Sequence, residues 1–595
     1  MRRIRTQVLV VGAGGSGLSA GIFLGDFGIE ALTIERHAST SHLPKAHYLN
    51  QRTMEIFRQH GFAGDVYARS APRENLGRIR WMTSIGGNGP LDRIKIHAPP
   101  IMGAGELAPL YDAKGTTHPT NIPQIRLEPV LADIAERRKP GHILFEHELL
   151  YFAERGGRVI ATVNDIKAGE TIEIEADYML AADAGKTVNP ALGIEMVGDT
   201  GLGDFCTIWF SADLSECLDE DDVPMRRIYH PATPFRFASL LTFGPKYFDR
   251  HSEEWASSFT IGRRLLSSNE EFFSIPEEDL VKQGLELLKI DVPVKVHKIS
   301  RWTLETVVAD KFSVGRVFLI GDAAHRHPPG AGLGLNSGFQ DAHNIAWKLA
   351  LVLKGRAGPA LLASYEAERR PVVTHNAQWA MHAMANGFVL MAALGSVPGE
   401  TPEQSAKRFG VLMSDTPLGE TRRAQLHEIF KVQRVEYAAH DMEMGFTYPQ
   451  GAVVDDGSPA AWRDPMGADY RPNTRPGSRL PHAWLHCNGC KLSTHDLIPP
   501  GGFLLLTGEE GRDWCNAAAR LAGETGVAIH AARIGGNEDI SDPSGVWKEQ
   551  CGIGDDGAVL VRPDAHIAFR ARVRVPDAYA ALREVFSQIH VGAAP

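Results

Sequence analysis

The chain has 595 residues, of which 62 are Lys or Arg and 72 are Asp or Glu, giving a formal net charge of −10 at pH 7. No basic run stands out, which argues against a nucleic-acid partner held by its phosphates. A chain of this length is expected to fold into several structural units, and its sparse cysteines favour a reducing compartment, the cytoplasm.

The N-terminus resembles a secretion signal, because three arginines precede the apolar residues 8–11. That reading fails, since the run turns at once into glycines and a long organised chain follows. The apolar stretch 388–397 is too short to span a bilayer. We therefore expect a soluble protein with no membrane partner.

The first predicted element is a buried strand over residues 7–11, followed by a glycine-rich turn and an apolar helix over 18–24. In the pattern G-x-G-x-x-G the first glycine permits a tight turn, the second admits a pyrophosphate, and the third lets helix and strand pack closely. The helix N-terminus then offers free N–H groups to phosphate. This predicts a dinucleotide site formed by Gly12, Gly14, Gly15, Ser16 and Gly17.

A second predicted strand, over residues 31–34, ends at Glu35 and Arg36. An acidic side chain at this point, roughly 20 residues after the glycines, is placed to accept hydrogen bonds from an adenosine ribose. Strand, glycines, helix and acid together make a glycine turn without function improbable.

The middle of the chain differs in character. Residues 191–300 contain strand-like stretches, such as 206–210 and 237–243, that are separated by turn residues. This pattern predicts an antiparallel sheet inserted into an α/β domain that continues over residues 301–450. A helix around Trp347 should bury the face made by Ala342, Ile345, Ala346 and Leu349.

Loop-forming residues near 455–459 and 473–477 mark a boundary, after which a small α/β unit is expected over residues 451–595. Its predicted elements are a strand at 503–506, a helix at 514–521, a strand at 527–529, a hairpin joining 559–561 to 567–569, and a terminal helix.

A second motif follows the predicted strand at 317–320. Gly321 and Asp322 stand where a carboxylate at a strand end could bind the ribityl hydroxyls of a flavin, which an NAD dehydrogenase would not need. The segment continues as His-Arg-His-Pro-Pro-Gly-Ala-Gly-Leu-Gly-Leu-Asn up to Asn336, so a simple turn is improbable.

With both motifs in place, the chain resembles the FAD-dependent aromatic-ring hydroxylases, and among them the phenol, chlorophenol and 2-hydroxybiphenyl hydroxylases. The resemblance covers nearly the whole chain, including residues 557–564. It implies a Rossmann-like FAD-binding domain (1–190 and 301–450), a substrate-binding sheet domain (191–300) and a thioredoxin-like C-terminal domain (451–595). It also implies a homodimer.

The resemblance implies how FAD is held. Asp322 would bind the ribityl chain, Pro328 would line the reactive edge, and backbone N–H groups of Leu335 and Asn336 would face flavin N1 and O2. A helix N-terminus favours the negative charge that reduced flavin carries there, and glycines allow close approach. The further cofactor residues carried over are Lys45, Gln124, Asp183, Gly321, Gly332 and Gly334. For Gln124, a solvated loop glutamine is an equal alternative.

Only one dinucleotide fingerprint is present, so NAD(P)H is expected to visit as a transient co-substrate. Two departures from the family leave NADH or NADPH open: Lys45 stands where arginine is common, and Ala184 follows Asp183 where glycine is usual. Lysine keeps the charge but loses the bidentate fork of arginine.

The resemblance also implies the chemistry. Reduced flavin and O2 would give a C4a-hydroperoxide, which hydroxylates a phenolic ring made electron-rich by deprotonation. His47 matches the position of an ionisable residue beside the substrate hydroxyl, and with a pKa near 6.5 it could take that proton. Arg236 and Tyr229 are weaker pocket candidates, for which a structural role is the alternative.

Two other functions stay open: hydroxylation of a larger polycyclic or heteroaromatic natural product, and flavin binding without turnover. No metal site is expected, because His325 and His327 lack a second ligand pair. Cys487-x-x-Cys490 precedes the strand after which a thioredoxin motif should open a helix, so the C-terminal domain is expected to be redox-inactive.

Overall fold

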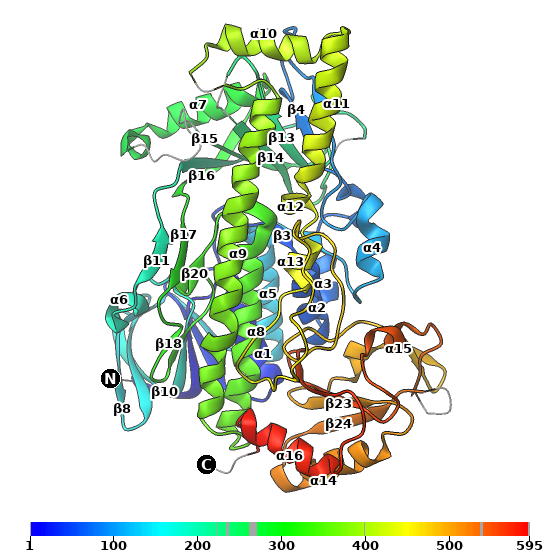
Figure 1. Cartoon of the computed structure of the whole chain (residues 1–595). Coiled ribbons are helices and arrows are strands. Elements are labelled where there is room, and N and C mark those ends of the chain that lie inside the picture. The colour runs from blue at the N-terminus through cyan, green and yellow to red at the C-terminus, as the bar shows by residue number, and fades with distance from the viewer. Residues whose placement is uncertain are drawn as a thin grey trace.

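The computed structural model describes residues 2–221, 223–233, 237–260, 270–397, 399–535 and 540–592. They form a mixed α/β fold with several sheets (Figure 1). Among the described helices, none combines the length and the apolar character needed to cross a membrane.

The largest sheet has eight strands and contains the predicted strands at 7–11, 31–34 and 317–320. Its centre is parallel, in the order β19-β10-β1-β2-β7, and β8 and β9 extend β10 as an antiparallel hairpin. The strands are β1 (Arg2–Val11), β2 (Ala31–Glu35), β7 (Ile143–Phe145), β8 (His147–Arg155), β9 (Arg158–Asp165), β10 (Glu170–Ala181), β18 (Ser313–Val314) and β19 (Val317–Leu319).

Helix α1 (Gly15–Asp26) packs on β1 and β2, and α5 (Gln124–Arg138) and α8 (Leu333–Leu353) pack against α1. The apolar residues 8–10 of β1 are fully buried, as an all-parallel strand covered on both faces should be. The predicted buried face of α8 is confirmed, since residues 342, 345, 346 and 349 are all inaccessible.

A second sheet has seven strands in the order β16-β12-β15-β14-β13-β4-β5. The predicted strands at 206–210 and 237–243 are confirmed, and the sheet also recruits two strands from residues 80–97. All neighbours are antiparallel except β13 and β4. The strands are β4 (Arg80–Met82), β5 (Lys95–His97), β12 (Asp204–Ser211), β13 (Met225–Tyr229), β14 (Phe237–Gly244), β15 (Glu254–Thr260) and β16 (Lys295–Thr303).

The long helix α9 (Ala360–Ala393) runs from the level of the large sheet to that of the seven-stranded sheet (Figure 1). At its far end it packs with α10 (Pro402–Leu412) and α11 (Pro417–Val432) against residues of the seven-stranded sheet. The two sheets are thus connected by α9 as well as by the segments of chain that pass from one sheet to the other.

Shorter elements connect these sheets and helices. They are β3 (Tyr48–Leu49), β6 (Thr120–Asn121), β11 (Met196–Asp199), β17 (Thr306–Ala309), β20 (His325–Arg326), α2 (Gln51–Gln59), α3 (Ala63–Tyr67), α4 (Ala108–Asp112), α6 (Val188–Leu192), α7 (Glu277–Leu288), α12 (Arg434–Tyr437) and α13 (His440–Met444). β3 pairs with β6, and α13 packs on α2.

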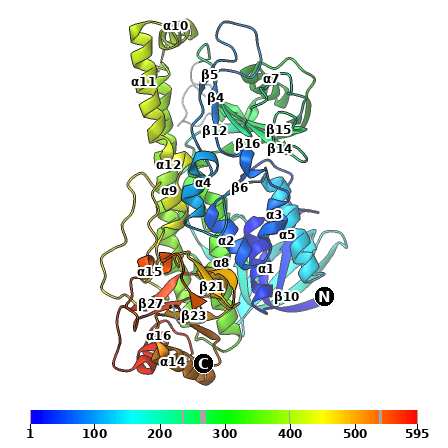
Figure 2. The same cartoon turned by 90° about the vertical axis from the view of Figure 1, so that its right-hand side faces the viewer.

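The C-terminal unit lies at the opposite end of the molecule from the seven-stranded sheet in both views (Figures 1 and 2). Its sheet has the order β24-β23-β26-β27, with β23 and β24 parallel around α14. The elements are β21 (Trp484–Cys487), β22 (Cys490–Ser493), β23 (Phe503–Thr507), α14 (Arg512–Thr525), β24 (Ile529–Arg533), β25 (Ile540–Ser541), α15 (Val546–Gln550), β26 (Ala558–Val561), β27 (Ile567–Ala571) and α16 (Ala578–Gln588).

One strand prediction was displaced. The strand expected at 527–529 lies at Ile529–Arg533, because α14 ends on Gly526 in the left-handed conformation and the chain needs two more residues to reach the sheet. Val527 is buried within this connection, which explains why it looked like a strand residue.

Candidate active site

The motifs singled out in the sequence meet at one edge of the large sheet. The carboxyl ends of β2, β1, β10 and β19 carry Glu35, Gly12, Asp183 and Gly321 respectively. Backbone N–H groups link these ends: Gly12 N donates to Ile34 O (2.8 Å), and Ala182 N donates to Val11 O (2.8 Å). Ligands of open α/β sheets bind at this kind of edge.

The fingerprint glycines have the steric roles that the motif requires. Gly12 has φ +106°, and a Cβ there would lie 2.5 Å from Ala182 O. A Cβ on Gly17 would lie 1.9 Å from Gly12 O, and a Cβ on Gly338 of α8 would lie 2.3 Å from Ser16 Oγ. α1, α8 and the Gly321 turn therefore pack closely, whereas Gly14 faces more open space, with its nearest neighbour at 3.6 Å.

Two glutamates flank the start of α1. The carboxylate of Glu35 accepts hydrogen bonds from Ala13 N (2.9 Å) and His37 N (3.0 Å), which fixes it at the turn. Glu128 accepts from Gly15 N (3.2 Å) and Ser41 N (3.0 Å), and burial raises the pKa of its carboxyl. Glu128 was missed in the sequence, although it follows Gln124 by one helical turn.

Gln124 belongs to the same group of contacts. Its Nε2 donates to Glu128 Oε1 (2.6 Å), and its backbone N donates to Ala46 O (2.8 Å). The positive charge of Lys45, an exposed side chain, partly opposes the rise that burial causes in the pKa of Glu128. Arg36 is exposed, and its Nε contacts His37. The structure thus brings Gln124 and Lys45 to the α1 end and leaves Arg36 at the surface.

The carboxylates of Asp183 and Asp322 differ in their hydrogen-bond partners. The Asp183 carboxylate accepts from the N–H groups of Gly185, Thr187 and Val188, and so fixes its own turn. Ala184 within this turn has φ +56°, the conformation in which glycine avoids a strain of roughly 1–2 kcal/mol. Asp322 is exposed, and within the described residues no hydrogen bond or ion pair occupies its carboxylate. Asp322 is therefore free to bind hydroxyl groups.

The segment before α8 fits a flavin. Gly332 (φ +62°) is the N-cap of α8, and among the described residues no side chain caps this helix end, so no side-chain oxygen there accepts from its first N–H groups. A Cβ on Gly334 would meet nothing closer than His327 Cβ at 3.7 Å. Leu335 and Asn336 lie in this first turn, and Pro328 is buried beneath it. Uncapped N–H groups at a helix N-terminus suit an acceptor that gains negative charge.

The side chain of Asn336 is committed to the protein. Its Oδ1 accepts from Asn50 N (3.0 Å) and Thr53 Oγ1 (2.7 Å), and its Nδ2 donates to Tyr48 O (3.0 Å) and Gly332 O (2.6 Å). These hydrogen bonds hold the start of α8 against the segment 47–53. Only the backbone N–H of Asn336 remains for a cofactor.

His47 lies directly before the residues that the Asn336 side chain contacts. Its Nδ1–H donates to Asn121 Oδ1 (3.3 Å), which leaves Nε2 as an acceptor. Burial and, more weakly, the charge of Arg227 lower the pKa of His47 to about 4, although its hydrogen bond to Asn121 opposes the shift. The expected pKa near 6.5 is therefore wrong for the ligand-free protein: the imidazole is neutral, but it is a weak base.

The other pocket candidates come from β13 and beyond it. Tyr229 is fully buried in the apolar cluster that also contains Trp81 and Leu241, and burial raises the pKa of its phenol. Arg236 lies outside the described residues. Arg227, two positions before Tyr229 on the same face of β13, was missed; its guanidinium donates to Glu436 (2.9 Å) and Ser239 (2.5 Å) and acts electrostatically on His47.

A buried acid also lies near this segment. Tyr48 Oη donates to Glu443 Oε1 (2.6 Å), and Gln51 N donates to Glu443 Oε2 (3.4 Å). Burial raises the pKa of Glu443 to about 7. Its distance of nearly 400 positions along the chain from Tyr48 leaves no sequence signal that could have found the pair.

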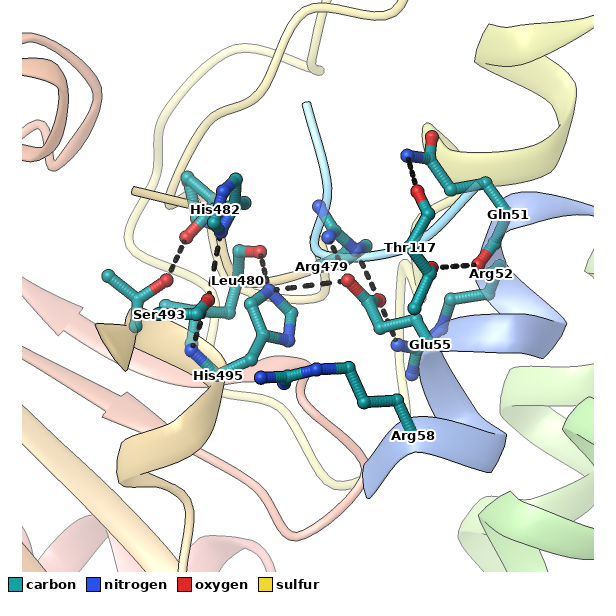
Figure 3. Close-up of polar contacts among 12 residues, drawn as sticks. Gln51, Arg52, Glu55, Arg58, Thr117, Arg479, Leu480, His482, Ser493 and His495 are labelled. Carbon is teal, nitrogen blue, oxygen red and sulfur yellow. Dashed lines mark hydrogen bonds and ion pairs between the residues drawn. The ribbon is translucent and has the colours of Figure 1, made fainter. Parts of the chain in front are cut away.

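Helix α2, which continues from His47 and Asn50, is held from its other side by the C-terminal unit. Glu55 accepts from Arg479 Nε (2.8 Å) and from Arg52 Nη1 (2.5 Å), with His495 Nε2 at 3.7 Å (Figure 3). Arg58 pairs with Asp496, and Arg52 donates to Asp564 O (2.7 Å). The position of His47 thus depends on residues near both ends of the chain.

The two histidines of the flavin segment have structural partners. His325 Nε2 contacts Asp341 Oδ2 at 2.6 Å, and the His325 and His327 rings stack with centroids 4.7 Å apart. Among the residues that the structure describes, no group of three or more His, Cys, Asp or Glu side chains could hold a metal. Cys487 and Cys490 face each other across the β21–β22 hairpin with free thiols.

Known families match most of the chain. A family described as "FAD binding domain" matches residues 5–380, and one described as "Aromatic-ring hydroxylase, C-terminal" matches residues 473–591.

Individual relatives match over their full length. The chain is 32% identical to 2,4-dichlorophenol 6-monooxygenase of Delftia acidovorans, over 96% of this chain and 95% of the relative. It is 33% identical to tetracenomycin A2 monooxygenase-dioxygenase of Streptomyces glaucescens, over 98% and 96%. The structure of the flavin-dependent monooxygenase PieE in complex with FAD and substrate superimposes with a TM-score of 0.88 at 34% identity, covering 99% of both chains.

Proposed function

Because the chain belongs to the FAD-dependent aromatic-ring hydroxylases, we propose that this monooxygenase inserts one atom of O2 into a phenolic ring at the expense of NAD(P)H. The overall change would be ArH + O2 + NAD(P)H + H⁺ → ArOH + H2O + NAD(P)⁺. The observation that supports a phenolic substrate is the free Nε2 of His47, which lies in the segment held against the start of α8.

The described residues fit FAD. Residues 12–17 with Glu35 would hold the adenosine and pyrophosphate, Asp322 and Gln124 the ribityl chain, and the N–H groups of Leu335 and Asn336 the flavin ring. The uncapped α8 end, and a Gly334 whose added Cβ would meet nothing closer than His327 Cβ at 3.7 Å, support this placement. When bound and reduced by NAD(P)H, FAD supplies the activated oxygen.

The protein's own part is to make the ring electron-rich. Nδ1–H of His47 is fixed by Asn121, so Nε2 can accept the phenol proton. A lone imidazolium is disfavoured by burial, but a phenolate formed beside it would raise the pKa of His47 again. The Arg227 guanidinium, which acts on the same imidazole, would stabilise the phenolate charge.

The first test is NAD(P)H consumption by the FAD-loaded protein with phenols, chlorophenols, hydroxybiphenyls and polycyclic phenols, with products identified by mass spectrometry. Stimulation with a product that gains one oxygen atom supports the proposal. Stimulation by polycyclic compounds alone would favour a biosynthetic substrate, in line with the tetracenomycin relative, and no stimulation by any compound would contradict the proposal.

His47→Ala sharpens this test. We expect this variant to bind FAD as tightly as the parent protein, because no fingerprint residue is changed, and to lose most of its coupled hydroxylation, by a factor of about 10² to 10⁴. Undiminished coupled turnover would remove His47 from the mechanism. Exposed His590→Ala is the matched control.

Several finer points also belong to the proposal. A thioredoxin-like fold for residues 451–595 is supported by the strand order β24-β23-β26-β27 with α14 between the two parallel strands. The boundaries 1–190, 191–300, 301–450 and 451–595, a homodimer and a cytoplasmic location are proposed with it; the six free cysteines support a reducing compartment. Light scattering and limited proteolysis would test the assembly and the boundaries.

A further inference from the structure

The contact between Tyr48 and Glu443 joins three separate elements. Tyr48 belongs to β3, Glu443 to α13, and Gln51, whose N–H donates to the second carboxyl oxygen, to the start of α2. Only 2% of Glu443 is exposed, so both of its oxygens face protein. A carboxyl in such a place is normally retained for a specific contact, because its burial costs free energy.

Tyr48 in turn supports the segment that the flavin ring would contact. A Cβ on Gly332 would lie 2.7 Å from Tyr48 Cδ1, so the tyrosine ring lies directly against this glycine. The carbonyl of Tyr48 accepts from Asn336 Nδ2 (3.0 Å). Both ends of the segment 332–336 therefore rest on Tyr48, through its ring and through its backbone.

Few other titratable groups act on the carboxyl of Glu443. The titratable groups that act on Glu443 are the phenols of Tyr48 on β3 and Tyr111 on α4; α2 presents the backbone N–H of Gln51. The loop before α8 meets α13 through apolar contacts of Ala331 and Leu333 with Ala439 and Met442. Of the titratable neighbours on α13, Asp441 is directed to Arg463 (2.7 Å), and His440, whose pKa burial lowers to about 3, is directed to Gln51 Oε1 (2.7 Å).

We propose that Glu443 is a positioning residue for the cofactor: through the Tyr48 hydroxyl it seats the segment 332–336, and its protonated form is the one that favours FAD binding. The inference deepens the proposed function and rests on FAD occupying this segment. Glu443 is not catalytic, since it reaches the site only through Tyr48.

The physical reason is linkage. The carboxyl of Glu443 changes charge around neutral pH because burial raises its pKa to about 7. The flavin ring, which is neutral when oxidised, would cover the segment in front of Tyr48 and exclude water from it, so it would disfavour the carboxylate further and raise that pKa. Binding then takes up a proton, and FAD affinity falls as the pH rises through 7. For a further rise of about one unit, the dissociation constant should increase about fivefold between pH 7 and 9.

The experiment measures FAD binding to the full-length apoprotein by quenching of flavin fluorescence from pH 6 to 9, without substrate or NAD(P)H. The parent protein should show the fivefold loss, and Glu443→Gln, which cannot ionise, should show a pH-independent dissociation constant. Asp441→Asn, which changes a carboxyl on the same helix that is directed to Arg463, should keep the loss. A pH dependence that persists unchanged in Glu443→Gln would overturn the inference, and so would a parent protein without any.

Tyr48→Phe provides a second route if Glu443→Gln folds poorly. It removes the hydroxyl but keeps the ring against Gly332, so binding should weaken and the pH dependence should move to a different midpoint. A dissociation constant and pH profile identical to those of the parent would contradict the role of Tyr48. Since no turnover is measured, failure of the phenol panel with these binding results intact would refute the proposed function alone.

Discussion

At the scale of single residues, the environment of His47 governs how activity should depend on pH. Because burial lowers the pKa of this imidazole to about 4 in the folded protein, it stays neutral over the whole range in which a free histidine would gain a proton. The same shift affects stability, because below pH ~6.5 the His47 imidazole is protonated in the unfolded chain but stays neutral in the folded chain. His47 therefore contributes a loss of stability as the pH falls from about 6.5 to 4.

We predict that kcat/KM for a phenolic substrate keeps its value from pH 7 down to about pH 5, when FAD is saturating. The reason is that kcat/KM reports the free enzyme, in which His47 is already neutral. A pH–rate profile of the parent protein and of His47→Gln checks this. An acid limb near pH 6.5 that disappears in His47→Gln would show that the imidazole titrates normally and that the prediction is wrong.

Residues that act through local geometry were visible in the sequence, and residues that act through distant contacts were not. Gly12 and Gly17 could be predicted because their steric demand follows from the turn itself. Glu128, Arg227 and Glu443 become part of the site only through partners on other elements: Gly15, His47 and Tyr48. An interpretation of one segment at a time carries no information on such partners.

At the scale of elements, α2 is the connection between the active site and the C-terminal unit. Its N-cap Asn50 contacts Asn336, and its middle carries Glu55, which is 2% exposed and neutralised by Arg479 and Arg52 (Figure 3). Removing one partner of such a buried pair leaves an uncompensated charge.

We predict that Arg479→Ala lowers the free energy of unfolding by about 3 to 5 kcal/mol and weakens FAD binding, because α2 would shift with Glu55. Thermal unfolding and FAD titration measure the two effects. The control is Arg471→Ala in the same segment, whose pair with Asp469 is exposed (61% and 50%) and should change stability by less than about 1 kcal/mol. Equal losses in the two variants would argue against the anchoring role of Glu55.

The helices and strands that were predicted came from periodicity, because the pattern of a covered strand or helix lies in consecutive residues. The seven-stranded sheet could be predicted only in part. Its strands β12 and β14 were expected, but β4 and β5 come from residues 80–97, and β4 is placed by pairing with β13. Pairing between strands so distant in sequence depends on the whole fold, which a local pattern does not contain.

At the scale of the whole molecule, a buried cluster of charges joins the C-terminal unit to the central helices. Glu368 of α9 accepts from Lys348 of α8 (2.7 Å) and from both Nη atoms of Arg562 (2.8 Å each). Arg562 also pairs with Asp564 (2.5 Å), and the Lys348, Glu368 and Arg562 side chains are fully inaccessible. The two positive and two negative groups balance one another.

Arg562→Ala should destabilise the entire chain by about 3 to 5 kcal/mol, because Glu368 and Asp564 would then share only Lys348. A single cooperative transition at a lower midpoint, followed by circular dichroism and by flavin release together, is the expected result. Arg574→Ala, with an exposed side chain (62%), serves as the control. If only the C-terminal unit unfolded early while the flavin stayed bound, the cluster would not couple the two parts.

The same contacts set an order of events in the cell. Glu55 and Glu368 leave the ribosome long before Arg479 and Arg562, whose guanidinium groups neutralise them. A nascent chain that ended before residue 479 would therefore hold these two acids beside Arg52 and Lys348 alone, at positions that the finished protein buries. It follows that α2 and α9 reach their final packing only after the C-terminal unit has been translated, although both helices are made earlier.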